Sequence, residues 1–216
     1  MMRASVRSLP LLFGLALLAA PAAAQTGPSF DCAKAGTAVE KAICADADLS
    51  WLDRTMGRLY AALQAGDKSV RDAQRAWLSA RNKCPANGLR DCLAGQYATR
   101  FSALSAGYDK AHVTGTYDYG DGTGGMTMVA FPDGTVSAWI STVGAAPSQP
   151  VCDIDFDAPA SRDRLRWTDP DSPLGDGQHC SIDIRFGGDG AQVTDHGCQT
   201  AYCGMNGAFA GRYRRN

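Results

Sequence analysis

Apolar residues in the first half of the chain recur at intervals of three and four. This spacing gives one apolar helical face over residues 49–63 and another over residues 70–80. A shorter helix ending near Cys44 is introduced by Thr37-Ala-Val-Glu40, which has the form of a capping box. A fourth periodic stretch follows residues 85–88. Short loops between helices favour antiparallel neighbours, so the pattern predicts a helical bundle.

Two further polar patterns predict where the longer helices begin. Ser50-x-x-Asp53 has a weaker form of the capping pattern and is expected to open the second helix. Ser69-x-x-Asp72 is expected to cap the third helix in the same way.

From about Val113 the helical period gives way to alternation. GGMTMVAFPDGTVSAWIST is two alternating runs around a Pro-Asp-Gly turn, and CSIDIRFGGDGAQVTDHG repeats this form around residues 187–190. The stretches TGTYDY and AGRYRR are expected to pair and close the sheet. The predicted fold class is therefore α+β, with an N-terminal disulfide-bonded antiparallel helical bundle followed by a small antiparallel β-sandwich or barrel.

The first 25 residues have the pattern of a secretory signal peptide. Two arginines precede an apolar run over residues 9–20, and Ala22-Ala23-Ala24 supplies small residues before Gln25. The run is shorter than the roughly 18 residues that a membrane span needs. We expect cleavage near Ala24-Gln25, a periplasmic or secreted protein, and no membrane insertion after cleavage. The predicted organisation is a signal peptide (1–24), a helical domain (25–110) and a β domain (111–216).

All the cysteines lie after the predicted cleavage point, four in each predicted domain. An even number in an exported chain indicates disulfides, and the spacing typical of a zinc site is missing. The eight candidates are Cys32, Cys44, Cys84, Cys92, Cys152, Cys180, Cys198 and Cys203.

Four cysteines in one domain allow three pairings, which the sequence leaves open. In the helical domain, an antiparallel return of the third helix favours Cys32–Cys84 with Cys44–Cys92. In the β domain, the spacing favours Cys152–Cys180 with Cys198–Cys203.

Charge is divided unevenly between the two predicted domains. Residues 25–110 hold 12 basic and 9 acidic side chains, whereas residues 111–216 hold 7 basic and 13 acidic ones. An acidic surface on the second domain would attract a basic partner and repel nucleic acid, so no nucleic-acid partner is expected. A merely solvated acidic surface explains the same composition.

Motifs for catalysis are sparse. His179 and His196 each neighbour a cysteine, but no G-x-S-x-G nucleophile elbow is present and no catalytic residue is assigned. The aspartates of CDIDFD alternate along one strand face and lack the glycine and glutamate of an EF-hand loop. TDPDSPLGDG has the composition of an Asx-rich loop. Neither a metal nor any other cofactor is expected, and no nucleotide-binding motif occurs.

The helical half resembles the N-terminal domain of the LprI-type lysozyme inhibitors. The resemblance covers about residues 30–106 and rests on FDCAKAGTAVEKAIC, LSWLDRTMGRLYAAL, AQRAWLSARNKC and CLAGQYATRFSAL, which together carry C-x11-C, L-D-x6-Y and Q-x2-W-x3-R-x2-C. The positions that it marks, besides its four cysteines, are Glu40, Asp53, Tyr60, Gln74, Trp77, Arg81 and Arg100.

The marked residues are interpreted mainly as a scaffold. Gln74, Trp77 and Arg81 share one helix face. We expect Trp77 to pack inward and Gln74 and Arg81 to tie the bundle to Glu40 or Asp53.

The resemblance implies a protein that binds a lysozyme and acts by occlusion rather than by catalysis. Because lysozymes are typically basic and carry carboxylates in their cleft, a loop with Arg162, Arg164 or Arg166 is a hypothetical contact with those acids. Two alternatives stay open. One is an envelope interaction module without a lysozyme partner, and the other is an exported hydrolase that depends on His179 or His196.

Overall fold

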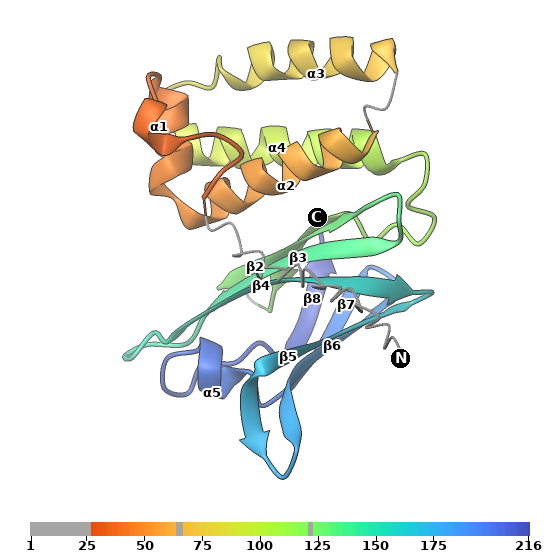
Figure 1. Ribbon diagram of the computed structural model, residues 1–216. Helices are drawn as coiled ribbons and strands as arrows, with labels where there is room; N and C mark the ends of the chain where they lie inside the picture. The colour runs from red at the N-terminus through yellow and green to blue at the C-terminus, as the bar shows by residue number, and fades with distance from the viewer. Residues whose placement is uncertain (1–26, 64–66, 121–122) are drawn as a thin grey trace, which may run out of the picture.

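The computed structural model describes residues 27–63, 67–120 and 123–216, so the predicted signal peptide lies outside the described residues. A helical region comes first and an antiparallel barrel follows (Figure 1). The elements of the helical region are η1 (Cys32–Lys34), α1 (Ala38–Ala45), α2 (Ala47–Leu63), α3 (Lys68–Arg81) and α4 (Leu89–Ser105). No helix within these described residues is both long and apolar enough to cross a membrane.

Side-chain caps fix where the helices begin. The capping box of α1 is confirmed, since the Thr37 side chain accepts from the Glu40 amide and the Glu40 carboxylate accepts from the Thr37 amide. The other two predicted starts are wrong by a few residues. Asp46 accepts from the Leu49 amide at the start of α2, and Asp67 is the N-cap of α3. In both cases an aspartate before the expected serine supplies the acceptor that the free amides need.

The helical region packs in layers. Helices α2 and α4 hold most of its apolar core, whereas α3 lies outside them as a separate layer (Figure 1). The only buried side chains on α3 are Gln74 and Arg81, which are both polar. Polar contacts and the partly buried Trp77, which packs against the apolar core, therefore attach α3 to the bundle.

The second half forms a closed barrel in which each strand pairs antiparallel with the next. Its strands are β1 (Gly115–Tyr119), β2 (Gly124–Ala130), β3 (Thr135–Val143), β4 (Val151–Ser161), β5 (Arg164–Gly175), β6 (Gln178–Gly187), β7 (Gly190–His196) and β8 (Gly211–Arg215), with the short helix α5 (Gln199–Tyr202) before the last strand. The first and last strands pair at Tyr117–Arg215 and Tyr119–Tyr213, as the sequence predicted. The barrel rather than the sandwich is thus the correct alternative.

Strand alternation separates the barrel interior from its outer face. Along β4, Ile154 and Phe156 are buried inside the barrel, whereas Asp153, Asp155 and Asp157 point outward. Side chains from all eight strands fill the interior, which leaves the outer face to make contacts with the rest of the chain.

Helices α2 and α4 pack on the outer face of the barrel, α4 against β1 and β2 and α2 against β3. Val129 and Phe131 of the barrel half belong to the apolar core of the helical region. Trp51 of α2 lies against Trp139 of β3, with ring centroids 6.1 Å apart. The guanidinium of Arg58 lies over the Phe131 ring, 5.0 Å from its centroid. One continuous apolar contact therefore joins the helices to the barrel.

Ion pairs complete this joint. Arg54 and Arg58 of α2 lie 3.4 Å and 2.7 Å from the carboxylates of Asp155 and Asp157. Arg58 also donates to the Ser137 hydroxyl on β3. Two of the three aspartates of CDIDFD thus face arginines of the helical region.

The disulfide pairings favoured from the sequence are wrong. In the helical region Cys32 pairs with Cys44 and Cys84 with Cys92, with Cα atoms 5.8 Å and 5.7 Å apart. The segment before α1 folds back along that helix, and a tight turn joins α3 to α4. Both bonds are therefore local, so neither links one long helix to a distant one.

The pairings in the barrel follow its strand order. Cys152 pairs with Cys203 and Cys180 with Cys198. Strand β5 lies between β4 and β6, which keeps Cys152 away from Cys180. The register of β6 with β7 brings Cys180 beside the residues that follow β7, and α5 separates Cys198 from Cys203.

The stretch TDPDSPLGDG is a strand rather than the predicted loop over most of its length. It lies largely within β5, whose pairing with β6 shifts register between Thr168 and Pro173. Asp169 is buried there and accepts from the Asp171 amide and the Tyr202 hydroxyl. Prolines cannot donate to the ladder, so the strand continues with an irregular register.

Replacing Phe131 with alanine tests the apolar contact between the helical region and the barrel. Because Phe131 is only 7% exposed, Phe131→Ala should lower the free energy of unfolding by about 3 kcal/mol. Urea unfolding of the oxidised protein measures this change. Leu78→Ala, at an exposed site on α3, is the control and should be nearly neutral. Equal costs for the two variants would contradict a shared core.

Candidate functional site

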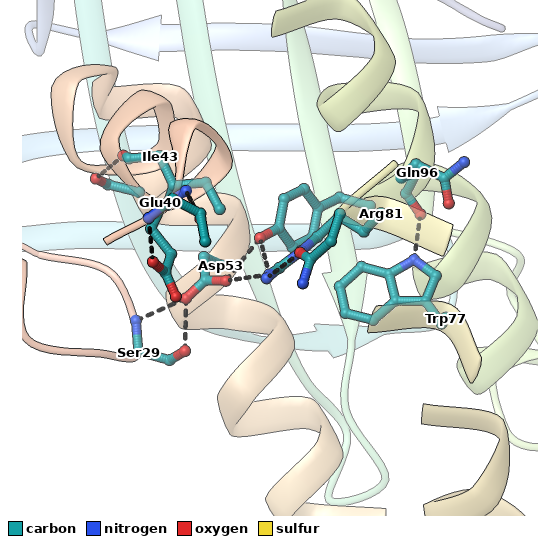
Figure 2. Close-up of polar contacts among 11 residues, drawn as sticks. Ser29, Glu40, Ile43, Asp53, Trp77, Arg81 and Gln96 are labelled. Atoms are coloured by element: carbon teal, nitrogen blue, oxygen red, sulfur yellow. Dashed lines mark hydrogen bonds and ion pairs between the residues drawn. The ribbon is translucent and has the colours of Figure 1, made fainter. Parts of the chain in front are cut away.

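A buried aspartate organises the residues that the sequence singled out (Figure 2). Asp53 of α2 is 4% exposed. One carboxylate oxygen accepts from the Tyr97 hydroxyl at 2.6 Å and from Arg81 Nη1 at 3.0 Å. The other accepts from the Ser29 amide at 2.9 Å and the Ser29 hydroxyl at 2.5 Å. Four donors compensate this carboxylate for its lost hydration.

Arg81 connects α3 to this network. Its Nη1 also donates to the Tyr97 hydroxyl at 2.9 Å. Its guanidinium lies 5.4 Å from the centroid of the Trp77 ring and 5.9 Å from that of Tyr97. The Trp77 indole in turn donates to the Gln96 carbonyl at 3.0 Å. Hydrogen bonds, cation–π contacts and an edge-on contact between the Trp77 and Tyr97 rings, whose centroids lie 5.3 Å apart, thus hold α3 against the bundle.

A second polar pair lies between α3 and α4. Arg100 Nε donates to Gln74 Oε1 at 2.9 Å. Arg100 Nη2 is buried without a hydrogen-bond partner among the described residues, and burial lowers the pKa of this guanidinium. Both contacts of α3 therefore use side chains that the family pattern marks.

Residues 31–105 match the family model of the lysozyme inhibitor LprI. The match covers the disulfide-bonded helices, from just before η1 to the end of α4. The barrel that follows has no family assignment. Comparisons with curated proteins and with solved structures gave no match.

The LprI region brings together only some of its marked residues. Arg81 pairs with Asp53, whereas Glu40 serves the capping box of its own helix. Tyr60 lies half-buried on α2 and makes no hydrogen bond to the aspartate. The network also uses Ser29 and Tyr97, which the sequence did not single out as site residues. A tyrosine on an apolar helix face was the available signal, since a buried hydroxyl needs a partner.

Burial and the neighbouring Asp53 carboxylate raise the pKa of Tyr97. The phenol therefore keeps its proton and remains a donor to the aspartate. The network fixes the angle between α2, α3 and α4, and its four donors leave Asp53 no open position for a substrate. The network therefore has a structural role.

The three arginines of the hypothetical partner contact lie on another part of the molecule. Arg162 sits in the turn between β4 and β5, with φ of 54°. Arg164 and Arg166 follow on the outer face of β5, and Arg185 of β6 pairs with Arg164 in register. Because α4 and α2 pack against β1, β2 and β3, these side chains on β5 lie on a part of the barrel wall away from the helices.

The structure places the two histidines at one edge of the barrel without a catalytic arrangement. His196 Nε2 lies 3.2 Å from the Asp183 carboxylate, and His179 Nδ1 is buried without a partner. Within the described ranges no hydrogen bond joins a serine hydroxyl to a histidine, and no three side chains are grouped as metal ligands. A Ser-His-Asp triad requires that missing bond.

Substitutions in the Asp53 network should destabilise the fold more than a substitution at an exposed ion pair. Asp53→Ala leaves the Arg81 charge buried without its partner, so it should cost about 3–5 kcal/mol of unfolding free energy. Tyr97→Phe removes one hydrogen bond to a charged group and should cost about 2 kcal/mol. Chemical denaturation followed by circular dichroism measures both. Asp72→Ala, which breaks an exposed pair with Lys68, is the control and should cost under about 1 kcal/mol. An equally small cost for Asp53→Ala would show that the network is dispensable.

The capping box predicts a specific loss of stability in acid. Bonds from the Thr37 and Gly36 amides lower the pKa of Glu40. Because the folded pKa lies below the unfolded one, the contribution of the carboxylate is present above the unfolded pKa and is lost as the pH falls through the folded pKa. Glu40→Gln should therefore flatten the stability profile below about pH 4.5, close to the ordinary glutamate pKa. Thermal unfolding from pH 2 to 7 measures the slope, and parallel profiles for the two proteins would argue against this role.

Proposed function

We propose that the protein is an exported lysozyme-inhibitor-like binding protein that acts by occlusion rather than by catalysis. The observation that carries this proposal is the LprI match over the disulfide-bonded helices. The leader-like sequence and four disulfides support an oxidising compartment outside the cytoplasm. The catalytic alternative has no support from the histidines, because neither one contacts a serine hydroxyl.

Occlusion requires a surface that keeps its shape when it meets an enzyme. A preorganised surface loses little conformational entropy on binding, which leaves more of the contact energy as affinity. The four disulfides, the Asp53 network and the apolar joint each restrict the relative motion of helices and strands. These features suit a protein that presents a fixed surface.

We propose the arginine turn, defined as Arg162, Arg164 and Arg166, as the contact with the lysozyme cleft. Arg162 and Arg164 make no ion pair with any residue that the structure describes, and Arg166 lies 3.8 Å from the Asp183 carboxylate in a loose contact. Guanidinium groups bind carboxylates through two parallel hydrogen bonds, so exposed arginines match a cleft that carries catalytic acids. This contact would weaken with salt, because exposed charges are screened.

Titration of lysozymes with the oxidised mature protein tests both proposals. Inhibition should rise with concentration to saturation and should weaken between low and moderate salt. Replacing Arg164 and Arg166 together with alanine should weaken inhibition by about tenfold, because two rim ion pairs of up to about 1 kcal/mol each contribute at most about 2 kcal/mol. The matched control replaces the partly exposed Arg71 and the exposed Arg75 of α3 with alanine and should leave inhibition unchanged.

The outcomes discriminate between the inhibitor proposal and the envelope interaction module. Inhibition that survives the loss of both β5 arginines would move the contact surface elsewhere, with the LprI helices as the next surface to vary. No inhibition of chicken-type, goose-type or invertebrate-type lysozyme would end the inhibitor proposal. The envelope interaction module would then be the remaining function for these domains.

A further inference from the structure

A cleft lies between the helical region and the outer face of the barrel. It has a volume of about 190 Å³ and is lined by α2 and the start of α4 on one side and by β1, β2 and β3 on the other. Neither the arginine turn nor the Asp53 network contributes to it. The cleft therefore raises a question of its own, namely what would bind there.

One wall of the cleft is aromatic. Trp51 of α2 and Trp139 of β3 both line it, with their ring planes inclined at 51°. Trp51 is only 3% exposed, whereas Trp139 is half-buried. The indole nitrogen of Trp139 is buried and has no hydrogen-bond partner among the described residues. An indole N–H only donates, so a ligand that satisfies it must offer an acceptor.

The floor of the cleft carries free hydroxyl groups in register. Thr116, Thr127 and Trp139 lie side by side across β1, β2 and β3, on the outer face. In the next row Ser141 lies opposite Gly125. None of the three hydroxyls makes a hydrogen bond to the described chain, although each can donate one and accept two. These neighbours are about 5 Å apart, the usual spacing of cross-strand pairs.

The charged groups at the rim already have partners. Arg90 pairs with Asp48 and Asp46, and the Asp118 carboxylate accepts from the Asn216 amide at 2.8 Å. The cleft thus offers neutral donors and acceptors beside an apolar aromatic wall, without an unpaired cation. Its volume is below the roughly 300–1,000 Å³ that is typical of sites for drug-sized ligands.

We propose that this cleft binds one neutral pyranose ring of a glycan. A pyranose has equatorial hydroxyls around its edge and an apolar C–H face, which match the row of hydroxyls and the tryptophan wall. An oxygen of the sugar would accept from Trp139 Nε1, and its hydroxyls would form hydrogen bonds with Thr116, Thr127 and Ser141. This site is independent of lysozyme binding, because it is built from other residues than the arginine turn.

Saturation-transfer NMR with the full-length oxidised protein tests this site. The probes are N-acetylglucosamine, glucose and galactose, with adenosine as a planar aromatic comparison, each titrated to about 50 mM. A dissociation constant in the millimolar range is expected for at least one sugar, because a ligand of about twelve heavy atoms reaches only modest affinity. Trp139→Phe keeps an aromatic ring but removes the donor, and Thr127→Val removes one hydroxyl at nearly constant volume. Each of these two variants should weaken binding of the sugar about fivefold or more.

Thr168→Val is the matched control, since Thr168 is exposed on the outer face of β5, away from the cleft. Near-ultraviolet circular dichroism of each variant shows that the fold is retained. Saturable sugar binding that the two cleft variants weaken and the control does not would support the site. No saturation with any of the sugars, sugar binding that is indifferent to both cleft variants, or a clear preference for adenosine would overturn it.

Discussion

Helix α2 is the element on which the rest of the structure depends, because two of its faces are buried in different ways. One face carries Asp53 into the polar network with Arg81 and Tyr97. The other carries Trp51 and Arg58 onto the barrel wall. The carboxylate fixes α2 against α3 and α4, and the aromatic contact fixes it against β3. The angle between helices and barrel follows from that double burial, and so does the cleft between them.

The fold class could be predicted because its signals are local. The capping box of α1 needs only residues 36–40, and each hairpin needs a glycine turn between two alternating runs. The alternation in CDIDFD correctly placed its three aspartates on one face of β4, which is the exposed face in the structure. The closure by β1 and β8 could also be predicted, because the first and last stretches of the β half have strand patterns and an unpaired sheet edge can pair with other chains.

The site could be predicted only in part, because its contacts depend on how distant elements meet. The pairing of Asp53 with Arg81 was one of two options that the spacing allowed, and no sequence pattern excluded Glu40 as the partner. Ser29 comes from an extended segment without any periodic pattern. The predicted disulfide pairings were wrong for a related reason. Four cysteines fix a number of possible pairings, and only the strand order and the turn between α3 and α4 select among them.

The charge asymmetry between the two halves has a different meaning once the joint is known. The basic excess of the helices and the acidic excess of the barrel partly meet each other, because Arg54 and Arg58 face Asp155 and Asp157. Those carboxylates are then poorly placed to steer a basic partner. On the uncovered side of the barrel, Arg164 and Arg185 instead lie next to each other. Net charge of a segment is thus a weak guide to its surface, since an internal contact removes charges of one sign selectively.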